Sequence, residues 1–432
     1  MKMIPVPEGL ETRCFLLDEG VLAEIPALLR QVFPDHRPWI VADENTWRAA
    51  GEKLRDILKD ADARPLEPLI MPGTPVLHAE YVHVRRLLER LPDGAVPMAV
   101  GGGTINDLVK RMSGEAGISY CCVPTAPSVD GYSSSGAAIV RDGMKQTLKC
   151  PAPLVIAADV EVLRRAPEEM KASGYADLLA KIPAGADWLI ADTLKIEAVD
   201  AEVWKLVQKP LRGWVSDPGD FGSVFHGLAA SGYAMQLYRD SRPASGMEHM
   251  CSHIWEMEGL GASHGFKVGI GTLAAAWLME RFFSMDREEL RGMMKPPKTR
   301  ARRQAEVREL LRAGCYGNAE ETAMAKFAEA ETVLRRREDI LASWETLRKR
   351  VMEQIHSFEE LRGMLRRAGC PTAPAEIGLS REKFIHGVLT AGLIRSRYSL
   401  LDVLEECGVT EAMTAELDRA FAELECRSAA AR

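Results

Sequence analysis

The sequence predicts a chain of two parts, an α/β domain with a parallel sheet followed by an all-helical domain. Two observations carry this prediction. Short apolar runs alternate with helical patterns from about residue 13 to residue 159, and after about residue 167 long helical patterns follow with few β-rich runs. Alternation of strands and helices is typical of a parallel sheet with helices on both faces. We therefore expect the domains to cover residues 1–165 and residues 166–432.

The predicted elements of the first part follow one another closely. PWIVAD (38–43) and EPLIMP (67–72) are strand-like, and helical patterns follow them over residues 44–59 and 78–91. VPMAV (96–100) leads into the helix GGGTINDLVKRM, and the strand ISYCCVPT (118–125) comes after it. GAAIVRDGMKQTLK (136–149) is typical of a hairpin that turns at Asp142 and Gly143. Parallel sheets bind ligands beyond the carboxyl ends of their strands, so we expect a site in the loops there.

Helical patterns dominate the second part of the chain. The segment 294–303, rich in Pro and Lys, is expected to be an exposed connection within it. The helical patterns cover residues 168–182, 187–194, 221–237, 270–283, 305–313, 319–359 and 411–427.

Composition excludes several classes of protein. With 432 residues, 47% of them apolar and 27% charged, the chain is typical of a soluble globular protein with more than one core. A formal net charge of -7 argues against nucleic-acid binding. No run approaches the ~20 apolar residues of a membrane span, and the N-terminus lacks the apolar core of a signal peptide. Nine cysteines without a framework spacing favour reduced thiols in a cytoplasmic protein.

Three consecutive glycines, Gly101, Gly102 and Gly103, stand between a predicted strand and a predicted helix. Because glycine has no Cβ, backbone N–H groups can approach a phosphate there, and the helix N-terminus favours negative charge. The run is neither the GxGxxG fingerprint nor a P-loop. A tight turn alone would also explain it.

Asp43 ends the second predicted strand. An acidic residue at this place commonly accepts hydrogen bonds from an adenine ribose and disfavours a 2′-phosphate, which favours NAD(H) while leaving NADP(H) open. An N-cap for the helix that begins at residue 44 would explain Asp43 equally well. Both interpretations stay open.

The segment TAPSVDGYSSSG (125–136) supplies hydroxyl groups and a carboxylate at the end of an apolar strand. Such groups at a strand's carboxyl end suit ligand binding. A surface loop is the alternative, although it would not explain why so polar a loop lies between apolar strands.

Three of the nine histidines fall within the stretch SGMEHMCSHIWEMEGLGASHG (245–265). His249 and His253 are a helical turn apart, and His264 follows. SGYADLLAK (173–181) adds Asp177 in an otherwise apolar stretch that we predict as a helix start. A buried aspartate is costly unless it is paired or ligates a cation. One carboxylate with two imidazoles suits Zn²⁺, Ni²⁺ or Fe²⁺, although histidines are also tolerated on helix surfaces.

An ordered set of motifs carries a family resemblance. GGGTIND, PTAPSVDGYSSSGA, DGMKQT, SGYADLLAK, SRPASGMEHMCSH and SHGFKVGIGTL together resemble the sn-glycerol-1-phosphate dehydrogenases. That family belongs to the superfamily of dehydroquinate synthase-like proteins and iron-containing alcohol dehydrogenases. The similarity runs from about residue 38 to residue 272, with weaker helical correspondence to about residue 427. It implies the dehydroquinate synthase-like fold, with a Rossmann-like nucleotide-binding domain first and a helical metal- and substrate-binding domain after it.

The resemblance also implies roles for individual residues. Asp177, His249 and His264 would ligate one divalent metal ion per subunit, Zn²⁺ or Ni²⁺ more readily than Fe²⁺. His253 would face the substrate and not the metal. By the chemistry of imidazole it would also deliver the proton in catalysis, itself or through a water that it orients, and a supporting or packing role is the alternative. The implied cofactor contacts, for NAD(H) and in part NADP(H), are Gly101, Gly102, Gly103, Thr104, Ile105, Thr125, Ala126, Pro127, Ser128 and Ser134. The implied substrate contacts are Asp130, Asp177 and His253, and the expected catalytic residues are His253 and Asp177.

The activity that the resemblance implies is reversible reduction of dihydroxyacetone phosphate to sn-glycerol 1-phosphate, a reaction of phospholipid biosynthesis. A phosphate ester needs cations, and Arg242 in SRPASG and Lys145 in DGMKQT are the candidates. Either could instead be an ordinary surface charge. A homodimer or higher homo-oligomer is the expected assembly.

Three alternative functions stay open. The first is a dehydrogenase of unphosphorylated glycerol or another polyol in the same superfamily. The second is a lyase of the dehydroquinate synthase type, against which Asp177 argues, because most such lyases carry a glutamate and two histidines at the metal. The third is a non-catalytic nucleotide- or metal-binding protein, which the complete ligand set disfavours.

Overall fold

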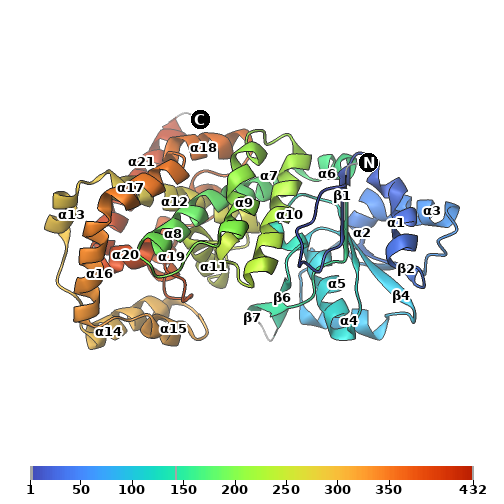
Figure 1. Cartoon of the computed structure of the whole chain (residues 1–432), viewed down its shortest axis with the longest axis horizontal. Coiled ribbons are helices and arrows are strands. Elements are labelled where there is room, and N and C mark those ends of the chain that lie inside the picture. Colours follow the sequence, from blue (N-terminus) through green and yellow to red (C-terminus); the bar gives the residue numbers. More distant parts are fainter. Residues whose placement is uncertain (1–2, 142–143, 431–432) are drawn as a thin grey trace. The chain divides into compact units, whose positions relative to one another are not determined.

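The computed structural model describes residues 3–141 and 144–430, apart from the side chains of residues 144–145 and 427–430. The chain divides into two compact units (Figure 1). Unit 1 comprises Met1–Leu178 and Arg212–Asp240, and unit 2 comprises Leu179–Leu211 and Ser241–Arg432. Each unit is therefore built from two stretches of chain. The expected division at residue 165, which assigned nucleotide binding to one side and metal and substrate binding to the other, stays a prediction.

A six-stranded sheet forms the centre of unit 1 and confirms the predicted parallel α/β fold. Its strand order is β1-β8-β5-β4-β2-β3, and every neighbouring pair is parallel. The strands are β1 (Cys14–Asp18), β2 (Arg37–Asp43), β3 (Leu69–Met71), β4 (Ala95–Gly101), β5 (Cys121–Pro124) and β8 (Val155–Asp159).

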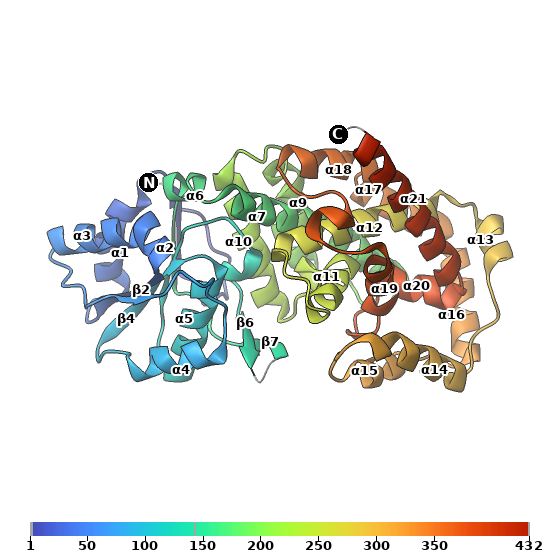
Figure 2. The same cartoon turned by 180° about the vertical axis from the view of Figure 1, so that it is seen from behind.

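Helices cover this sheet, as Figure 2 shows for α1, α3, α4 and α5. In α3, Leu54 and Leu58 are four residues apart, so both point into the core beside the strand residues Ile40 and Met98. The helices of unit 1 are α1 (Ile25–Val32), α2 (Glu44–Thr46), α3 (Glu52–Asp60), α4 (Tyr81–Glu89), α5 (Gly103–Ala116), α6 (Val160–Arg164), α7 (Glu168–Leu179) and α10 (Phe221–Tyr238).

The direction of the strand connections reverses between β2 and β4. From β2 the chain continues outward to the edge strand β3, whereas from β4 it continues the other way, to β5. Such a switch point is where open parallel sheets bind ligands. The register pairs Val41 with Ala99, so Asp43 and Gly101 stand at the same end of their neighbouring strands.

An antiparallel hairpin of β6 (Gly136–Arg141) and β7 (Met144–Lys149) forms a separate two-stranded sheet in unit 1. These strands confirm the predicted hairpin. Its expected turn residues, Asp142 and Gly143, lie outside the described residues.

Unit 2 is helical, as predicted, and its described residues contain no strand. The predicted pattern over residues 319–359 is divided among several helices. One division is readable in the sequence, because Ser357 and Glu360 form a capping box that starts a new helix. The helices outside unit 1's set are α8 (Lys181–Thr193), α9 (Ala201–Trp214), α11 (Met247–Met257), α12 (His264–Ser284), α13 (Arg287–Met293), α14 (Arg300–Leu310), α15 (Ala319–Ala325), α16 (Ala330–Ala342), α17 (Trp344–Gln354), α18 (Phe358–Arg367), α19 (Arg381–Ala391), α20 (Leu400–Cys407) and α21 (Thr410–Ala430).

The proline- and lysine-rich segment was expected to be a connection over residues 294–303. Residues 294–299 form it, between the end of α13 and the start of α14, whereas residues 300–303 belong to α14. Across the described ranges, none of the helices combines the length and the apolar character that a membrane crossing requires.

Candidate metal centre and active site

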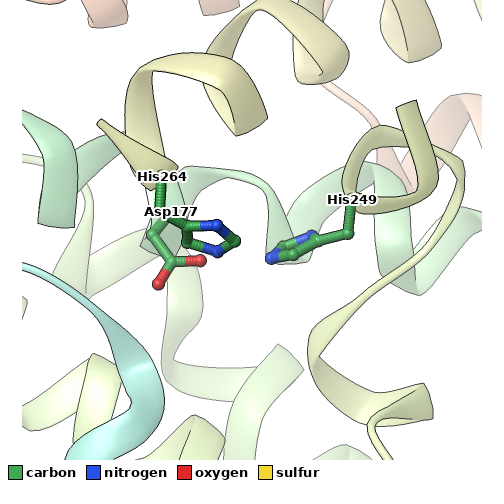
Figure 3. A group of neighbouring side chains, drawn as sticks. All are labelled: Asp177, His249 and His264. Atoms are coloured by element: carbon green, nitrogen blue, oxygen red, sulfur yellow. The ribbon is translucent and has the colours of Figure 1, made fainter. Parts of the chain in front are cut away.

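Asp177, His249 and His264 come together although they are far apart in the sequence. One potential ligand atom from each lies within 4.8 Å of the others. Figure 3 shows the two imidazoles pointing toward each other, with the carboxylate beside His264. Asp177 is fully buried, and His249 is 5% exposed. The structure thus brings together the three residues that the sequence predicted as a ligand set.

The geometry of the three side chains fits a divalent ion. Nitrogen and oxygen ligands at about 2.0–2.2 Å from an ion lie roughly 3–3.5 Å from each other. The observed separations reach at most 4.8 Å, which small side-chain rotations would close. A mixed donor set of one carboxylate and two imidazoles suits Zn²⁺ or Ni²⁺. Metal ligation by these residues is taken up as a proposal below.

The position of Asp177 within its helix differs from the prediction. It lies near the C-terminal end of α7 and not at a helix start. The helix begins at Glu168, as does the helical pattern predicted over residues 168–182, because Glu168 and Glu169, directly after Pro167, form a favourable first turn. The apolar residues around Asp177 reflect burial of this end of the helix.

Glu248 is a site residue that sequence reasoning missed. Its Oε1 lies 2.8 Å from Nδ1 of His249 and accepts a hydrogen bond from the backbone N–H of Gly246 at 2.6 Å. Glu248 is fully buried. A carboxylate on one imidazole nitrogen fixes the ring and leaves Nε2 for a metal ion. Adjacent positions on a helix point in different directions, so no sequence pattern connects Glu248 with His249.

Asp130 holds the carboxylate of Asp177. Its backbone N–H donates a hydrogen bond to Oδ2 of Asp177 at 2.9 Å, and its own Oδ2 accepts one from the hydroxyl of Ser231 at 3.1 Å. The expectation for Asp130 was a substrate contact, which stays a prediction. Its contact with Asp177 was not foreseen.

His253 stands beside the ligand candidates, one helical turn after His249. Its ring centroid lies 6.4 Å from the ring centroids of both His249 and His264. His253 does not belong to the group of three with atoms within 4.8 Å. This placement agrees with the expected role next to the metal ligands, and the role itself stays a prediction.

The loop after β5 is a packed part of unit 1, so the surface-loop alternative is wrong. Two glycines allow neighbouring helices to approach it: a Cβ on Gly174 would lie 1.6 Å from the carbonyl oxygen of Pro127, and one on Gly232 would lie 2.0 Å from Oγ of Ser133. The predicted cofactor residues in this loop are buried: Thr125, Ala126, Pro127, Ser128 and Ser134.

The three glycines form the turn from β4 into α5. Gly102 is the N-cap residue, with extended backbone and no capping side chain, so the first N–H groups of α5 carry no side-chain cap. A Cβ on Gly101 would lie 2.5 Å from Cβ of Ile105, and one on Gly103 would lie 2.9 Å from Cγ2 of Val129. The close approach requires glycine, and a helix N-terminus of this kind suits a phosphate. Gly101 to Gly103, Thr104 and Ile105 thus lie at the switch point of the sheet, and contact of these residues with a cofactor stays a prediction.

The N-cap interpretation of Asp43 is confirmed. Its Oδ1 accepts hydrogen bonds from the backbone N–H groups of Asn45 and Thr46, both at 2.8 Å. The hydroxyl of Thr46 in turn accepts from the N–H of Asp43, which completes a capping box. Contact of Asp43 with a cofactor ribose stays a prediction.

Of the two phosphate-binding candidates, Arg242 is deeply buried. It is 1% exposed, so its interpretation as a surface charge is wrong. Its Nη2 donates to the carbonyl oxygen of Asp187 at 2.9 Å, and its Nε lies 3.3 Å from Oε2 of Glu197. The side chain of Lys145 lies outside the described part of the structure. Phosphate binding by either residue stays a prediction.

Comparison with known proteins shows which proteins the chain resembles. Residues 16–167 match the family model described as "Iron-containing alcohol dehydrogenase". The chain is 30% identical over 394 residues to the glycerol-1-phosphate dehydrogenase [NAD(P)+] of Geobacillus thermodenitrificans, covering 86% of this chain and 87% of that one. It is 31% identical over 389 residues to the protein of the same name from Geobacillus stearothermophilus, covering 85% and 86%.

Among solved structures, glycerol dehydrogenase from Schizosaccharomyces pombe is similar with a TM-score of 0.58 at 14% identity. The match covers 96% of this chain and 93% of that one. At this identity the likeness shows the fold alone, and it confirms the predicted fold class.

Proposed function

Because the chain belongs to the glycerol-1-phosphate dehydrogenase family, we propose that it reduces dihydroxyacetone phosphate to sn-glycerol 1-phosphate, reversibly and with NAD(P)H. The observation that carries the proposal is the convergence of Asp177, His249 and His264. This donor set suits an ion that acts on a carbonyl oxygen. We assign the three residues as ligands of one divalent ion, Zn²⁺ or Ni²⁺ by the chemistry of the donors.

The metal would supply Lewis-acid chemistry: it would polarise the ketone and stabilise the negative charge that develops on its oxygen. The chain's own part is to hold the ligands in place before the substrate arrives. Glu248 fixes the ring of His249 through Nδ1, and the N–H of Asp130 fixes Oδ2 of Asp177. Ligands held by buried hydrogen bonds cost no reorganisation during the reaction.

The cofactor would supply the hydride from its nicotinamide ring. We assign its pyrophosphate to the uncapped N-terminus of α5 at Gly101–Gly103, with Thr104 and Ile105 in the first turn. Asp43, at the end of the neighbouring strand, is assigned to the adenine ribose and favours NAD(H). The buried loop from Thr125 to Ser128, with Ser134, is assigned to the nicotinamide side.

The reduced oxygen must receive a proton, and we assign its delivery to His253. The ring lies beside those of His249 and His264 and is one helical turn from the first of them. An imidazole has a suitable pKa range for proton transfer near neutral pH. Asp130 is assigned to the substrate through its side chain, while its backbone holds Asp177.

The substrate phosphate is assigned to Arg242 and Lys145. Arg242 stands at the start of the turn that leads into α11 and is already held by Glu197 and the backbone of Asp187. A phosphate would therefore meet a guanidinium with a fixed orientation, which suits recognition of one substrate.

No specific observation favours the other functions. A polyol dehydrogenase would use the same metal site, and the fold likeness to glycerol dehydrogenases does not separate it from the proposal. Measuring turnover of the two ketones separates the two functions. We expect metal-loaded protein to oxidise NADH with dihydroxyacetone phosphate and only weakly with dihydroxyacetone. Turnover of the neutral ketone alone would establish the polyol enzyme.

A further inference from the structure

One face of α5 packs against the loop that carries Asp130. Gly103, Asn106 and Lys110 are three and four residues apart, so they lie on the same side of the helix. A Cβ on Gly103 would lie 2.9 Å from Cγ2 of Val129, which shows how closely the loop approaches. Nδ2 of Asn106 donates a hydrogen bond to the carbonyl oxygen of Gly131 at 3.3 Å.

Lys110 makes three further hydrogen bonds to this loop. Its Nζ donates to the carbonyl oxygens of Gly131 at 2.6 Å and Gly136 at 3.0 Å, and to Oγ of Ser134 at 3.3 Å. The three protons of the ammonium thus meet three oxygen acceptors on one short segment. Asp107 adds an ion pair at 3.8 Å.

The burial of Lys110 makes these bonds important. The side chain is fully buried, and burial lowers the pKa of its ammonium. A buried ammonium is tolerated only when its protons are satisfied, because the cost of removing it from water is large. Lys110 therefore favours one conformation of residues 131–136, because another conformation would take three oxygen acceptors away from the buried ammonium.

The segment that Lys110 holds leads directly to a metal ligand. Gly131 follows Asp130, whose backbone N–H donates to Oδ2 of Asp177 at 2.9 Å. The position of this N–H depends on the backbone around it. Two helices hold this part of the loop: α5 through the bonds of Lys110 and Asn106 to the carbonyl oxygen of Gly131, and α10 through the bond from Ser231 to the side chain of Asp130.

We propose that Lys110 is a positioning residue for metal binding: it holds the loop at Gly131 so that the N–H of Asp130 orients the carboxylate of Asp177. The inference rests on the proposed function, because it takes Asp177 as a metal ligand. Lys110 contacts neither metal nor substrate in this account. Outer partners of metal ligands typically contribute about 10- to 100-fold in metal affinity, which is the effect expected for Lys110.

The test is Zn²⁺ binding by full-length protein, freed of metal and without cofactor or substrate, measured by competition with a chelating dye. Lys110→Met removes the ammonium and keeps an unbranched side chain. We expect its dissociation constant for Zn²⁺ to rise by about 10- to 100-fold. An unchanged dissociation constant in folded Lys110→Met protein would overturn the inference.

Lys326 provides a matched control. It is also a largely buried lysine that donates to two carbonyl oxygens, those of Gly392 and Arg397, both at 3.1 Å. It also pairs with Asp402, and none of these partners is a ligand candidate. Lys326→Met should therefore lower stability but leave Zn²⁺ affinity within about 2-fold of the wild type. An equal loss of affinity in both variants would mean a general effect of destabilisation and would overturn the inference.

A milder variant decides the matter if Lys110→Met does not fold. Ser231→Ala removes only the hydroxyl that holds Asp130 from α10. It should weaken Zn²⁺ binding by about 3-fold or more, and no change would contradict the role of Asp130.

Asp177→Asn separates this inference from the proposed function. If Asp177→Asn binds Zn²⁺ like the wild type, the metal assignment itself fails. If Asp177→Asn loses Zn²⁺ while Lys110→Met retains it, the metal assignment stands and only the role of Lys110 fails.

Discussion

Oδ2 of Asp187 accepts a hydrogen bond from the backbone N–H of Met247 at 2.8 Å, two residues before the ligand candidate His249. The other carboxylate oxygen accepts from the N–H of Leu400, also at 2.8 Å. Asp187 therefore ties α8 to the start of α11 and to α20. Burial, and next the negative charge of Glu248, raise the pKa of Asp187 to about 7, although Arg242 opposes the shift.

This raised pKa predicts how stability depends on pH. The folded pKa of Asp187 lies above the unfolded value of 3.8. The stability from this group is thus fully present below pH 3.8 and is lost as the pH rises through about 7. Between pH 6 and pH 8 the free energy of unfolding should fall by about 1 kcal/mol from Asp187 alone.

Asp187→Asn removes this titration. The difference in unfolding free energy between wild type and variant should therefore shrink between pH 6 and pH 8, as measured by urea denaturation under matched metal conditions. A difference that stays constant over this interval would show that Asp187 does not titrate there.

Arg242 should contribute to stability whatever its role toward substrate. Arg242→Met leaves Glu197 without this cation and the carbonyl of Asp187 without its donor. Because Glu197 is partly exposed, we expect a loss of about 2 kcal/mol, less than for a fully buried pair. If the guanidinium also binds phosphate, KM should rise far more for dihydroxyacetone phosphate than for dihydroxyacetone. Equal changes in both KM values would show that Arg242 does not bind the substrate phosphate.

Asp43 is the N-cap residue of α2, and we also predict that it binds the cofactor ribose. Two variants distinguish these two roles. Asparagine is as good an N-cap as aspartate, so Asp43→Asn should retain stability while losing the negative charge. We expect it to lower the preference for NADH over NADPH by about 10-fold in kcat/KM, since one charged hydrogen bond to the ribose is worth about that much. Asp43→Ala should in addition destabilise the protein by about 1 kcal/mol. An unchanged cofactor preference in Asp43→Asn would show that Asp43 acts only as an N-cap and does not bind the ribose.

His253 should affect turnover without affecting metal content. His253→Gln keeps a polar side chain but removes the group that can exchange a proton near neutral pH. We expect kcat to fall by about 10²- to 10⁴-fold and the pH dependence of kcat to change its shape. Metal analysis should still find one ion per chain. Loss of the ion together with activity would instead make His253 a residue that supports the metal site.

The sequence predicted much of the fold and most of the residues that gather at the site. Apolar runs such as PWIVAD specify β2, and the glycine run marks the turn into α5, because both signals are local. The ligand candidates Asp177, His249 and His264 were found through the family resemblance, and the structure brings them together.

The sequence alone did not identify the residues that support the site. In the sequence Lys110 is an ordinary lysine of a predicted helix, and only the tertiary fold brings the carbonyl groups of Gly131 and Gly136 to it. The buried environment of Arg242 was likewise missed, because its neighbours Asp187 and Glu197 belong to another part of the chain. Helix boundaries after residue 319 were wrong for a related reason: caps such as Ser357 interrupt a pattern that looks continuous.

The configuration of the product tests the central claim most directly. Protein loaded with Zn²⁺ or Ni²⁺ would be given NADH and dihydroxyacetone phosphate, and the glycerol phosphate formed would be assigned by enzymes specific for one enantiomer. The account predicts sn-glycerol 1-phosphate as the product, with little turnover of dihydroxyacetone. Formation of sn-glycerol 3-phosphate, or turnover of the neutral ketone alone, would contradict it.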